Sequence, residues 1–436
     1  MPLLLSHNDS PDHEDSLSQD GFIKDIAEVI KNCTPPKGIG INGYWGTGKT
    51  SALIQLHKEL TGITPFDNKK LSEASEVIPI WFEAWRYQHE PLPIVALLNE
   101  IRAGFGLWTK VVEGAGKIGG VTFLGVLGAF DETIKAASGG VIAPKLGEIS
   151  KIGQQWESER YKTPLPSQNI SLLLESAIGE ALGNKKKLVI FIDDLDRCTP
   201  STALKLLEGI KVYLNLKNCV VVFGMDQRQI ERALIKALEL EQENGEHQAR
   251  EYLEKICQDI YHLPLLNQQI KWKYLETLLK ELDLGDGSHC QYLQAVLTEY
   301  DCLPANPRKI KALANRFAVI LRRDIMTDNE TEIANTTIRR EYALLVAMTI
   351  IYTFHRRLNE QLEKNPDYIN TVIVYAQKPE GVDESLLAPM SDIKPSHNGS
   401  ELLPTNPSDS NVFRLHRLFI GLGTITFDEI DVFLGK

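Results

Sequence analysis

The stretch GIGINGYWGTGKTSALIQLHKEL, residues 38–60, decides the fold. Its first five residues are typical of a short buried strand, and the residues from Thr50 onward are typical of a helix. Between the two lies GYWGTGKT, residues 43–50, which matches the pattern G-x-x-x-x-G-K-[ST]. A glycine-rich turn with a strand before it and a helix after it predicts a loop that wraps around phosphate groups.

Each residue type in this loop suits one part of a nucleoside triphosphate bound with Mg²⁺. The glycines let backbone N–H groups curl around the β- and γ-phosphates, Lys49 brings a positive charge to them, and the Thr50 hydroxyl is a ligand for Mg²⁺. The following helix directs its positive end at the phosphates. We therefore expect ATP and Mg²⁺ as cofactors, bound by Gly43, Tyr44, Trp45, Gly46, Thr47, Gly48, Lys49, Thr50 and Ser51.

A second element is IFIDDLDRC, in which a hydrophobic run ends in two adjacent acids. Leu188–Ile192 is continuously apolar, as in a parallel strand that is buried on both faces. Asp193 would hold Mg²⁺ through water, and Asp194 would polarise the attacking water as general base. Because neighbouring carboxylates repel each other, a cation is favoured at this point. The predicted metal ligands are thus Thr50 and Asp193, and Lys49 and Asp194 are predicted to be catalytic.

Two weaker catalytic candidates are Asp226 and Arg308. Asp226 ends the apolar run VVVFGM and could contact the γ-phosphate or the water; alternatively, it caps the helix that begins at Gln227. Arg308 begins a later helix and could sense the γ-phosphate in cis; the alternative is a solvated charge. Arg197 follows the carboxylates, and either an arginine finger in trans or an ion pair with Asp196 would suit it.

Strand-like and helix-like segments alternate along the first part of the chain. The strand-like runs are GIGIN, VIPIWF, KKKLVIFI, NCVVVFG and QDIYHL. Such alternation predicts an α/β fold with a parallel sheet and helices on both faces. We expect the chain to divide into a disordered N-terminus (1–16), a P-loop NTPase core (17–265) with a Gly/Ala-rich insertion at about 104–160, a helical domain (266–376), a linker or long loop (377–411), and a C-terminal segment (412–436) that docks back as a short helix.

Composition favours a cytoplasmic protein. The six cysteines form no C-x-x-C pair and are expected to be reduced thiols. The net charge of −11 does not indicate a nucleic-acid partner, although a local basic patch would be compatible with one. The uncharged run Ile118–Phe130 is shorter than the roughly 20 residues that span a bilayer as a helix. We therefore expect it to pack on the core; a membrane-interacting hairpin is the less favoured alternative.

Taken together, these motifs resemble the KAP family of P-loop NTPases. The matches run in family order from about Ser18 to about Leu321 and include the Trp-containing GYWGTGKTS and the run IDDLDRC (Ile192–Cys198). The remaining matches are FEAWRY (Phe82–Tyr87), FGMDQRQIERAL (Phe223–Leu234), YLEKICQ (Tyr252–Gln258) and NPRKIKALANRF (Asn306–Phe317).

The resemblance implies a core of the ASCE/AAA+ type, in which the fourth strand lies between the P-loop strand and the carboxylate strand. The implied strand order is 5-1-4-3-2, followed by a helical bundle. The implied activity is ATP hydrolysis by a regulatory switch or assembly ATPase, often in antiviral (phage) defence, with a separate effector protein as partner. Many members carry paired transmembrane helices between FEAWRY and IDDLDRC, but the insertion of this chain is shorter and richer in glycine than such a pair.

Cores of this type often bury the nucleotide between subunits, which predicts a homo-oligomer. Besides Arg197, the candidates for an arginine finger in trans are Arg228 and Arg232. Two other functions fit the same motifs: a nucleic-acid-associated motor or loader, and a membrane-associated scaffold in which bound ATP is structural. The acidic net charge disfavours the first, and the short insertion disfavours the second.

Overall fold

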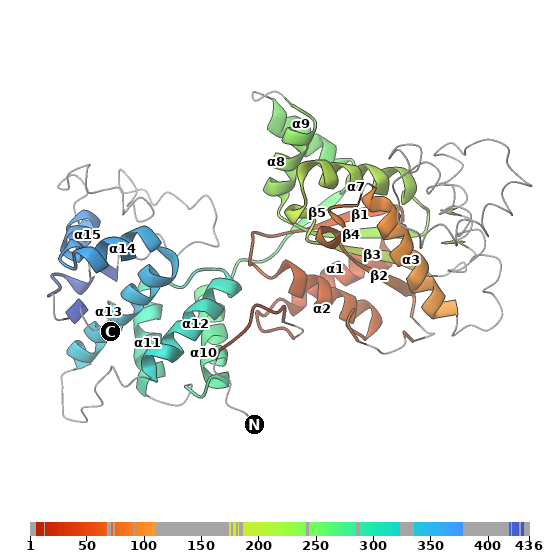
Figure 1. Ribbon diagram of the computed structural model, residues 1–436. Coiled ribbons are helices and arrows are strands. Elements are labelled where there is room, and N and C mark those ends of the chain that lie inside the picture. The colour runs from red at the N-terminus through yellow and green to blue at the C-terminus, as the bar shows by residue number, and fades with distance from the viewer. Residues whose placement is uncertain are drawn as a thin grey trace, which may run out of the picture.

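The computed structural model describes residues 6–109 (apart from 13, 68–70, 73–74 and 91), 174–175, 178–179, 182, 186–240, 244–284, 288–322, 335–377, 418–419, 421–426 and 429–430. These residues form an α/β domain, followed in the chain by a helical domain (Figure 1). The N-terminal segment lies between the two domains, alongside helices of both.

The α/β domain is built on a parallel sheet of five strands. The strands are β1 (Lys37–Asn42), β2 (Val77–Glu83), β3 (Lys187–Asp193), β4 (Cys219–Met225) and β5 (Asp259–His262). Their order across the sheet is β2-β3-β4-β1-β5. Read from the other edge, this is 5-1-4-3-2, so the predicted fold class and strand order are confirmed.

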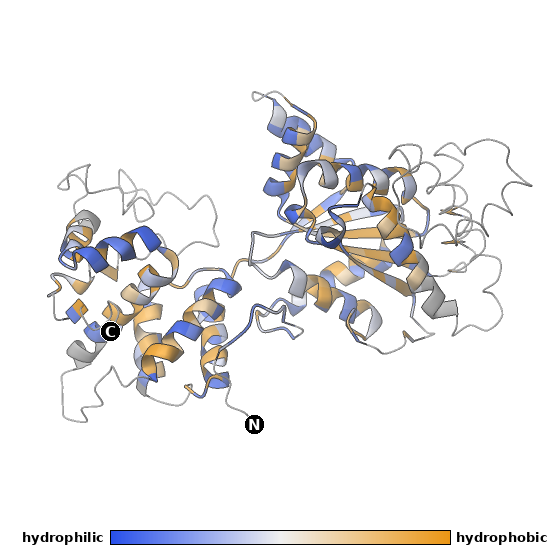
Figure 2. Cartoon of the chain, viewed as in Figure 1, coloured by the Kyte–Doolittle hydropathy of each residue, from blue (hydrophilic) through white to orange (hydrophobic). Residues whose placement is uncertain are grey.

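The apolar run of β3 supplies side chains to both faces of the sheet, because successive residues of a strand point in opposite directions. Leu188, Ile190 and Ile192 belong to the hydrophobic cluster on one face. Val189 and Phe191 belong to the cluster on the other face. Figure 2 shows the strands as a hydrophobic layer between helices whose outer surfaces are largely hydrophilic.

Helices cover both faces of this sheet. On one face lie α1 (Asp20–Asn32) and α2 (Lys49–Thr61). On the other lie α3 (Pro93–Thr109), α7 (Pro200–Tyr213), α8 (Gln227–Ala237) and α9 (Gly245–Glu254). Since parallel strands need crossover connections, this layering follows from the strand order.

The register of the parallel strands brings their carboxyl ends to one edge. Glu83 of β2 lies opposite Asp193 of β3, and Asn42 of β1 lies opposite Met225 of β4. The residues that follow these strands therefore meet at one place, which is where ligands bind in open α/β sheets.

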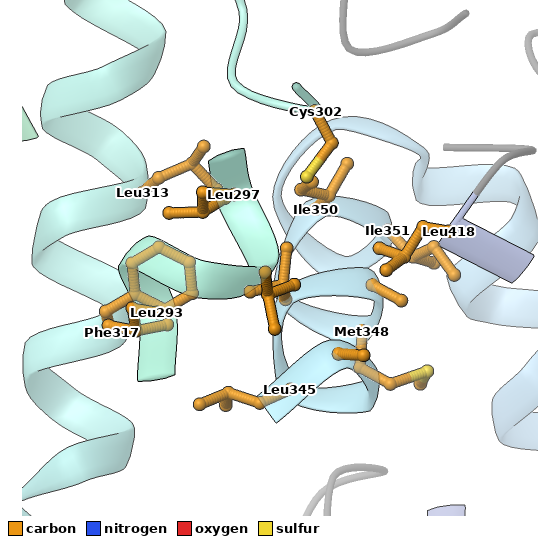
Figure 3. Close-up of a cluster of buried hydrophobic side chains, with 14 of the residues drawn as sticks. Leu293, Leu297, Cys302, Leu313, Phe317, Leu345, Met348, Ile350, Ile351 and Leu418 are labelled. Atoms are coloured by element: carbon orange, nitrogen blue, oxygen red, sulfur yellow. The ribbon is translucent and has the colours of Figure 1, made fainter. Parts of the chain in front are cut away.

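The helical domain consists of α10 (Gln268–Glu281), α11 (Ser288–Tyr300), α12 (Pro307–Leu321), α13 (Asn335–Phe354), α14 (Arg356–Lys364) and α15 (Tyr368–Gln377). Its core, part of which Figure 3 shows, joins side chains of several helices, among them Leu293, Phe317 and Leu345. Leu418 and Phe419 of the C-terminal segment are buried in the same core. These two residues of the C-terminal segment therefore pack on this domain.

The N-terminal segment departs from the predicted disorder of residues 1–16. Residues 6–17, which we call the N-terminal strap, follow a defined path apart from residue 13, which is not described. His7 is held by paired hydrogen bonds: its backbone N–H donates to Asn315 Oδ1 at 2.7 Å, and its carbonyl accepts from Asn315 Nδ2 at 3.0 Å. Acidic side chains of the strap meet basic ones of α12, as described below. Residues 1–5 lie outside the described residues.

Most of the predicted insertion and linker also fall outside the described residues. Of residues 104–160, those up to Thr109 continue α3, and the rest are not described. Residues 378–417 are not described either. Among the helices that are described, none is long and apolar enough to cross a membrane.

Lys187, the first residue of β3, holds the end of α1. Its Nζ donates hydrogen bonds to the carbonyl oxygens of Ile30, Lys31 and Cys33 at 3.0, 2.6 and 2.7 Å. The last carbonyls of a helix have no partner within the helix, and a cation there also complements the helix dipole. This side chain therefore joins α1 to the sheet.

We predict that Lys187→Met lowers the free energy of unfolding by about 1–3 kcal/mol, because it removes the charged donor from these carbonyls and keeps the apolar stem. The urea midpoint measures the change. Lys24→Met is the matched control: Lys24 pairs with Asp20 at the surface of the same helix, and its loss should leave the midpoint unchanged. Equal midpoints for both variants would contradict the assigned role of Lys187.

Candidate nucleotide-binding site

The loop between β1 and α2 has the backbone conformation that its glycines allow. Gly46 has φ +81° and Gly48 has φ +97°, both in the left-handed region that glycine adopts without strain. The Thr47 hydroxyl closes the loop by donating to the Tyr44 carbonyl at 2.7 Å. α2 then begins at Lys49, so the loop lies at a helix N-terminus, where anions bind favourably.

Lys49 is buried beneath this loop. Its Nζ lies 3.1 Å from the Gly43 carbonyl oxygen and 3.1 Å from Asp196 Oδ2. Only 8% of the Lys49 side chain and 6% of the Asp196 side chain are exposed. A buried charge pair of this kind depends on both members, since loss of one leaves an uncompensated charge. From the sequence, Asp196 was expected only as a possible partner of Arg197.

Asp193 lies beside the Thr50 side chain, which hydrogen-bonds to it. Burial and the charge of Asp194 raise the pKa of the Asp193 carboxyl to about 7. Its Oδ1 atom is buried and makes no hydrogen bond to any described residue. Mg²⁺ binds oxygen ligands such as carboxylates. The Asp193 oxygen that accepts no hydrogen bond and the neighbouring Thr50 hydroxyl are ligands of this kind. The two predicted metal ligands therefore lie together and fit this ion.

Asp194 has φ +58°, in the left-handed region that few residues other than glycine adopt. Backbone strain of this kind is common where a side chain must point into a functional site. Its Oδ1 lies 2.8 Å from Arg197 Nε, so Arg197 pairs with Asp194 and not with Asp196. Burial raises the pKa of the Asp194 carboxyl even though Arg197 opposes the shift.

Glu83 and Arg86 also belong to this site, and sequence analysis did not single them out. Glu83 ends β2 opposite Asp193, and Arg86 follows in the short 3-10 helix η1 (Ala84–Tyr87). The two side chains form an ion pair at 2.5 Å. The available signal was the acid that ends the strand VIPIWFE, in the same position as the acid that ends KLVIFID.

These groups line one cavity of about 410 Å³. Its volume is within the range of small-molecule sites. Of the predicted site residues, the following line it: Trp45, Gly46, Gly48, Lys49, Thr50, Ser51, Asp193, Asp194 and Arg308. Gly43, Tyr44 and Thr47 line a separate cavity of about 340 Å³ on the other side of the loop. Asp226 lines neither cavity.

Arg308 reaches the cavity from α12, in cis. Its guanidinium carbon lies 4.4 Å from the centre of the Trp45 ring, and its Nε lies 2.7 Å from Asp9 Oδ1. Asn306 caps the same helix and donates from Nδ2 to the Trp45 carbonyl at 2.9 Å. A Cβ at Gly46 would lie 2.7 Å from Asn306 Oδ1, so only glycine allows this close approach. The helical domain therefore contacts the phosphate-binding loop directly.

Asp226 caps α8, the alternative role that its sequence position allowed: its carboxylate accepts from the Arg228 backbone N–H at 3.2 Å. Its own N–H donates to Asp196 Oδ2 at 3.1 Å, which links it indirectly to Lys49. The Arg228 guanidinium lies 4.0 Å from the centre of the Tyr44 ring. Arg232, one turn further along α8, is exposed.

Comparison with known proteins matched the chain to one family and to a phage exclusion protein. The description of the matching family is "KAP family P-loop domain", and the match spans residues 19–323. The phage T7 exclusion protein of Escherichia coli (strain K12) is 24% identical over 308 residues, which are 64% of this chain and 37% of that protein. The chain thus spans little more than a third of this relative.

Two solved structures resemble the chain at low similarity. The Drosophila ORC bound to DNA has a TM-score of 0.37 and 14% identity, covering 95% of this chain and 84% of that one. The Aeropyrum pernix ORC2 protein in ADPNP-ADP complexes has a TM-score of 0.32 and 11% identity, covering 92% and 94%. Neither likeness bears on function.

The family assignment follows from the extent of the first match and from the geometry above. The matched residues include the phosphate-binding loop, both acids at the end of β3, and α12. The chain belongs to the KAP family of P-loop NTPases.

Proposed function

We propose that the chain binds ATP with Mg²⁺, hydrolyses it, and acts as a regulatory ATPase whose nucleotide state controls assembly or a partner. The observation that carries the proposal is the composition of one cavity. Lys49 and Thr50 line it together with Asp193, whose buried Oδ1 has no hydrogen-bond donor among the described residues. A cation and phosphate oxygens would supply what that arrangement requires.

The side chains divide the chemistry among them. Lys49 would bind the phosphates, and Thr50 and Asp193 would hold Mg²⁺, which neutralises charge on the phosphates when bound. Asp194 would orient and deprotonate the attacking water, because burial moves the pKa of its carboxyl up, toward neutral pH. Glu83 lines the same cavity and is a second acid able to perform that task.

Direct contact between the loop and α12 supports the regulatory part of the proposal. Asn306 and Arg308 of α12 hydrogen-bond to the carbonyls of Trp45 and Gly46, at 2.9 and 3.5 Å. Phosphates bound to the loop N–H groups would therefore change the environment of the helical domain. Arg308, which also lines the cavity, would sense the γ-phosphate in cis.

For the biological setting we propose antiviral (phage) defence in the cytoplasm, with a separate effector protein. Membership of the KAP family and the similarity to a phage exclusion protein support this setting. We also propose that the active form is a homo-oligomer that completes the nucleotide site with an arginine in trans.

The first test of the site is Lys49→Ala. We predict a loss of ATP affinity of roughly tenfold to a hundredfold, because the phosphates lose a charge-assisted hydrogen bond. Calorimetric titration measures it, and Lys58→Ala, an exposed lysine of the same helix, is the control that should bind as the parent does. Lys49→Ala leaves the buried Asp196 charge without its partner. The double variant Lys49→Ala/Asp196→Asn therefore keeps the test valid if the single variant misfolds. Affinity equal to the parent's in both would show that this is not the phosphate site.

Glu83, Asp193 and Asp194, the three cavity acids at the carboxyl ends of β2 and β3, should differ in the phenotypes of their variants. We predict that Asp193→Asn loses the Mg²⁺-dependent part of ATP affinity, whereas Asp194→Asn binds Mg²⁺ and ATP normally and hydrolyses about 10²–10⁴-fold more slowly. Phosphate release and binding are measured on the same samples. If Glu83→Gln abolishes hydrolysis and Asp194→Asn does not, Glu83 is the base and our assignment is wrong.

Hydrolysis should depend on contacts between subunits. Arg197 and Arg228 are engaged within their own chain, by Asp194 and Tyr44, whereas Arg232 is exposed. We therefore predict that Lys49→Ala and Arg232→Ala, each inactive alone, recover activity when mixed, because one interface then combines an intact loop with an intact arginine. An arginine finger contributes about 10³–10⁵-fold in rate. A monomer in ATP and Mg²⁺, with specific activity independent of concentration, would exclude this mechanism.

A further inference from the structure

The cavity is larger than its phosphate-binding part. Lys49, Asp193 and Asp194 mark one end, where the phosphates would lie. The other end is lined by the N-terminal strap and by the helical domain, through Asp9, Ser10, Pro11, Asp12, Leu17, Tyr274 and Lys311. Since the strap and the loop line the same cavity, a group attached to phosphates in the loop can extend toward this second end.

Both domains hold the strap in place at the cavity. On the side of the α/β domain, the Asp12 backbone N–H donates to Ser51 Oγ at 3.0 Å, and Gln55 Nε2 donates to the Glu14 carbonyl at 2.9 Å. On the side of the helical domain, Lys311 Nζ donates to the Ser10 carbonyl at 3.0 Å. The strap therefore forms a wall of the cavity, and it is anchored to Ser51, the residue after Thr50.

The strap end of the cavity is poorly suited to phosphate. Its lysine, Lys311, is already paired with Asp12 at 2.9 Å, and Asp9 is a second carboxylate in the lining. With these carboxylates present, another anion would gain little there. Pro11 and Leu17 add apolar surface to the lining. Apolar surface beside hydrogen-bonding groups suits a base and a sugar better than an anion.

Asp12 is the polar centre of this end. Its Oδ2 accepts from the Tyr274 hydroxyl at 3.1 Å, and its Oδ1 accepts from Lys311. Burial and the nearby Asp12 charge raise the pKa of Tyr274, so its hydroxyl stays protonated and donates. A carboxylate has about four acceptor positions, of which these contacts use two. The Asp12 side chain is 29% exposed, which leaves it accessible to a ligand that donates.

We propose that the N-terminal strap forms the nucleoside subsite of this cavity, in which Asp12, oriented by Tyr274 and Lys311, accepts a hydrogen bond from a ribose hydroxyl. This inference rests on the proposed function, because it assumes that a triphosphate occupies the loop. In this proposal, the strap makes the cavity bind a ribonucleotide more tightly than a phosphate chain that carries no nucleoside.

The test compares ATP with inorganic tripolyphosphate, each with Mg²⁺, by calorimetric titration of the full chain. The parent should bind ATP at least about tenfold more tightly than tripolyphosphate. Asp12→Ala should weaken ATP roughly tenfold to a hundredfold, the range expected for a hydrogen bond to a charged group, and leave tripolyphosphate unchanged. Asp25→Ala, which removes an exposed acid of α1, should change neither affinity.

Tyr274→Phe is the second variant, because it keeps the buried ring and removes only the hydroxyl that orients Asp12. It should weaken ATP by less than Asp12→Ala and should also leave tripolyphosphate unchanged. Equal affinity of the parent for ATP and tripolyphosphate, or an equal loss of both in Asp12→Ala, would overturn the nucleoside subsite while the proposed ATP site stands. A parent that binds neither probe would overturn the proposed function itself.

Discussion

The parallel register of four neighbouring strands is the constraint on which the site depends. β2, β3, β4 and β1 end at the same edge, with Glu83 opposite Asp193 and Asn42 opposite Met225. Three of these strands end in a polar residue, namely Glu83, Asp193 or Asn42, and β4 is followed by Asp226. A shift of one residue in any pair would bury acids in the wrong layer and turn apolar side chains to solvent. Burial of the sheet on both faces therefore fixes the place where the acids meet the loop.

The charges at this edge lie around one buried lysine, Lys49. Lys49 lies against Asp196, while Asp193 and Asp194 repel each other, and the pKa of each of the latter two carboxyls is raised mainly by burial. This set has more acids than it has buried cations among the described residues. Addition of a dication and a phosphate chain would give Asp193 a partner and Lys49 a second anion to bind. The arrangement thus favours a state in which both ions are bound.

Sequence alone identified the parts of the site that lie within single motifs. The loop from Gly43, the acids that end β3, and the strand order could be predicted because each depends on local pattern or on family resemblance. Glu83 and Asp196 were missed as site residues, since their roles arise from the register of neighbouring strands and from the packing of Lys49. The N-terminal strap was predicted to be disordered because few of its residues are apolar. Its order comes from partners such as Arg308 and Lys311, which are far away in the sequence.

The same distant contacts connect the loop, where the proposed nucleotide would bind, to the helical domain. Gly46 approaches Asn306 so closely that a Cβ would collide with it, and the Trp45 ring packs against the Arg308 guanidinium. Close-packed contacts of this kind transmit small displacements, because there is no free volume to absorb them. The strap adds a second connection, since Asp12 bonds to Ser51 on one side and to Lys311 on the other. Under the proposed function, a ligand that displaces the loop or the strap would therefore also displace α12, which would link the occupancy of the cavity to the position of the helical domain.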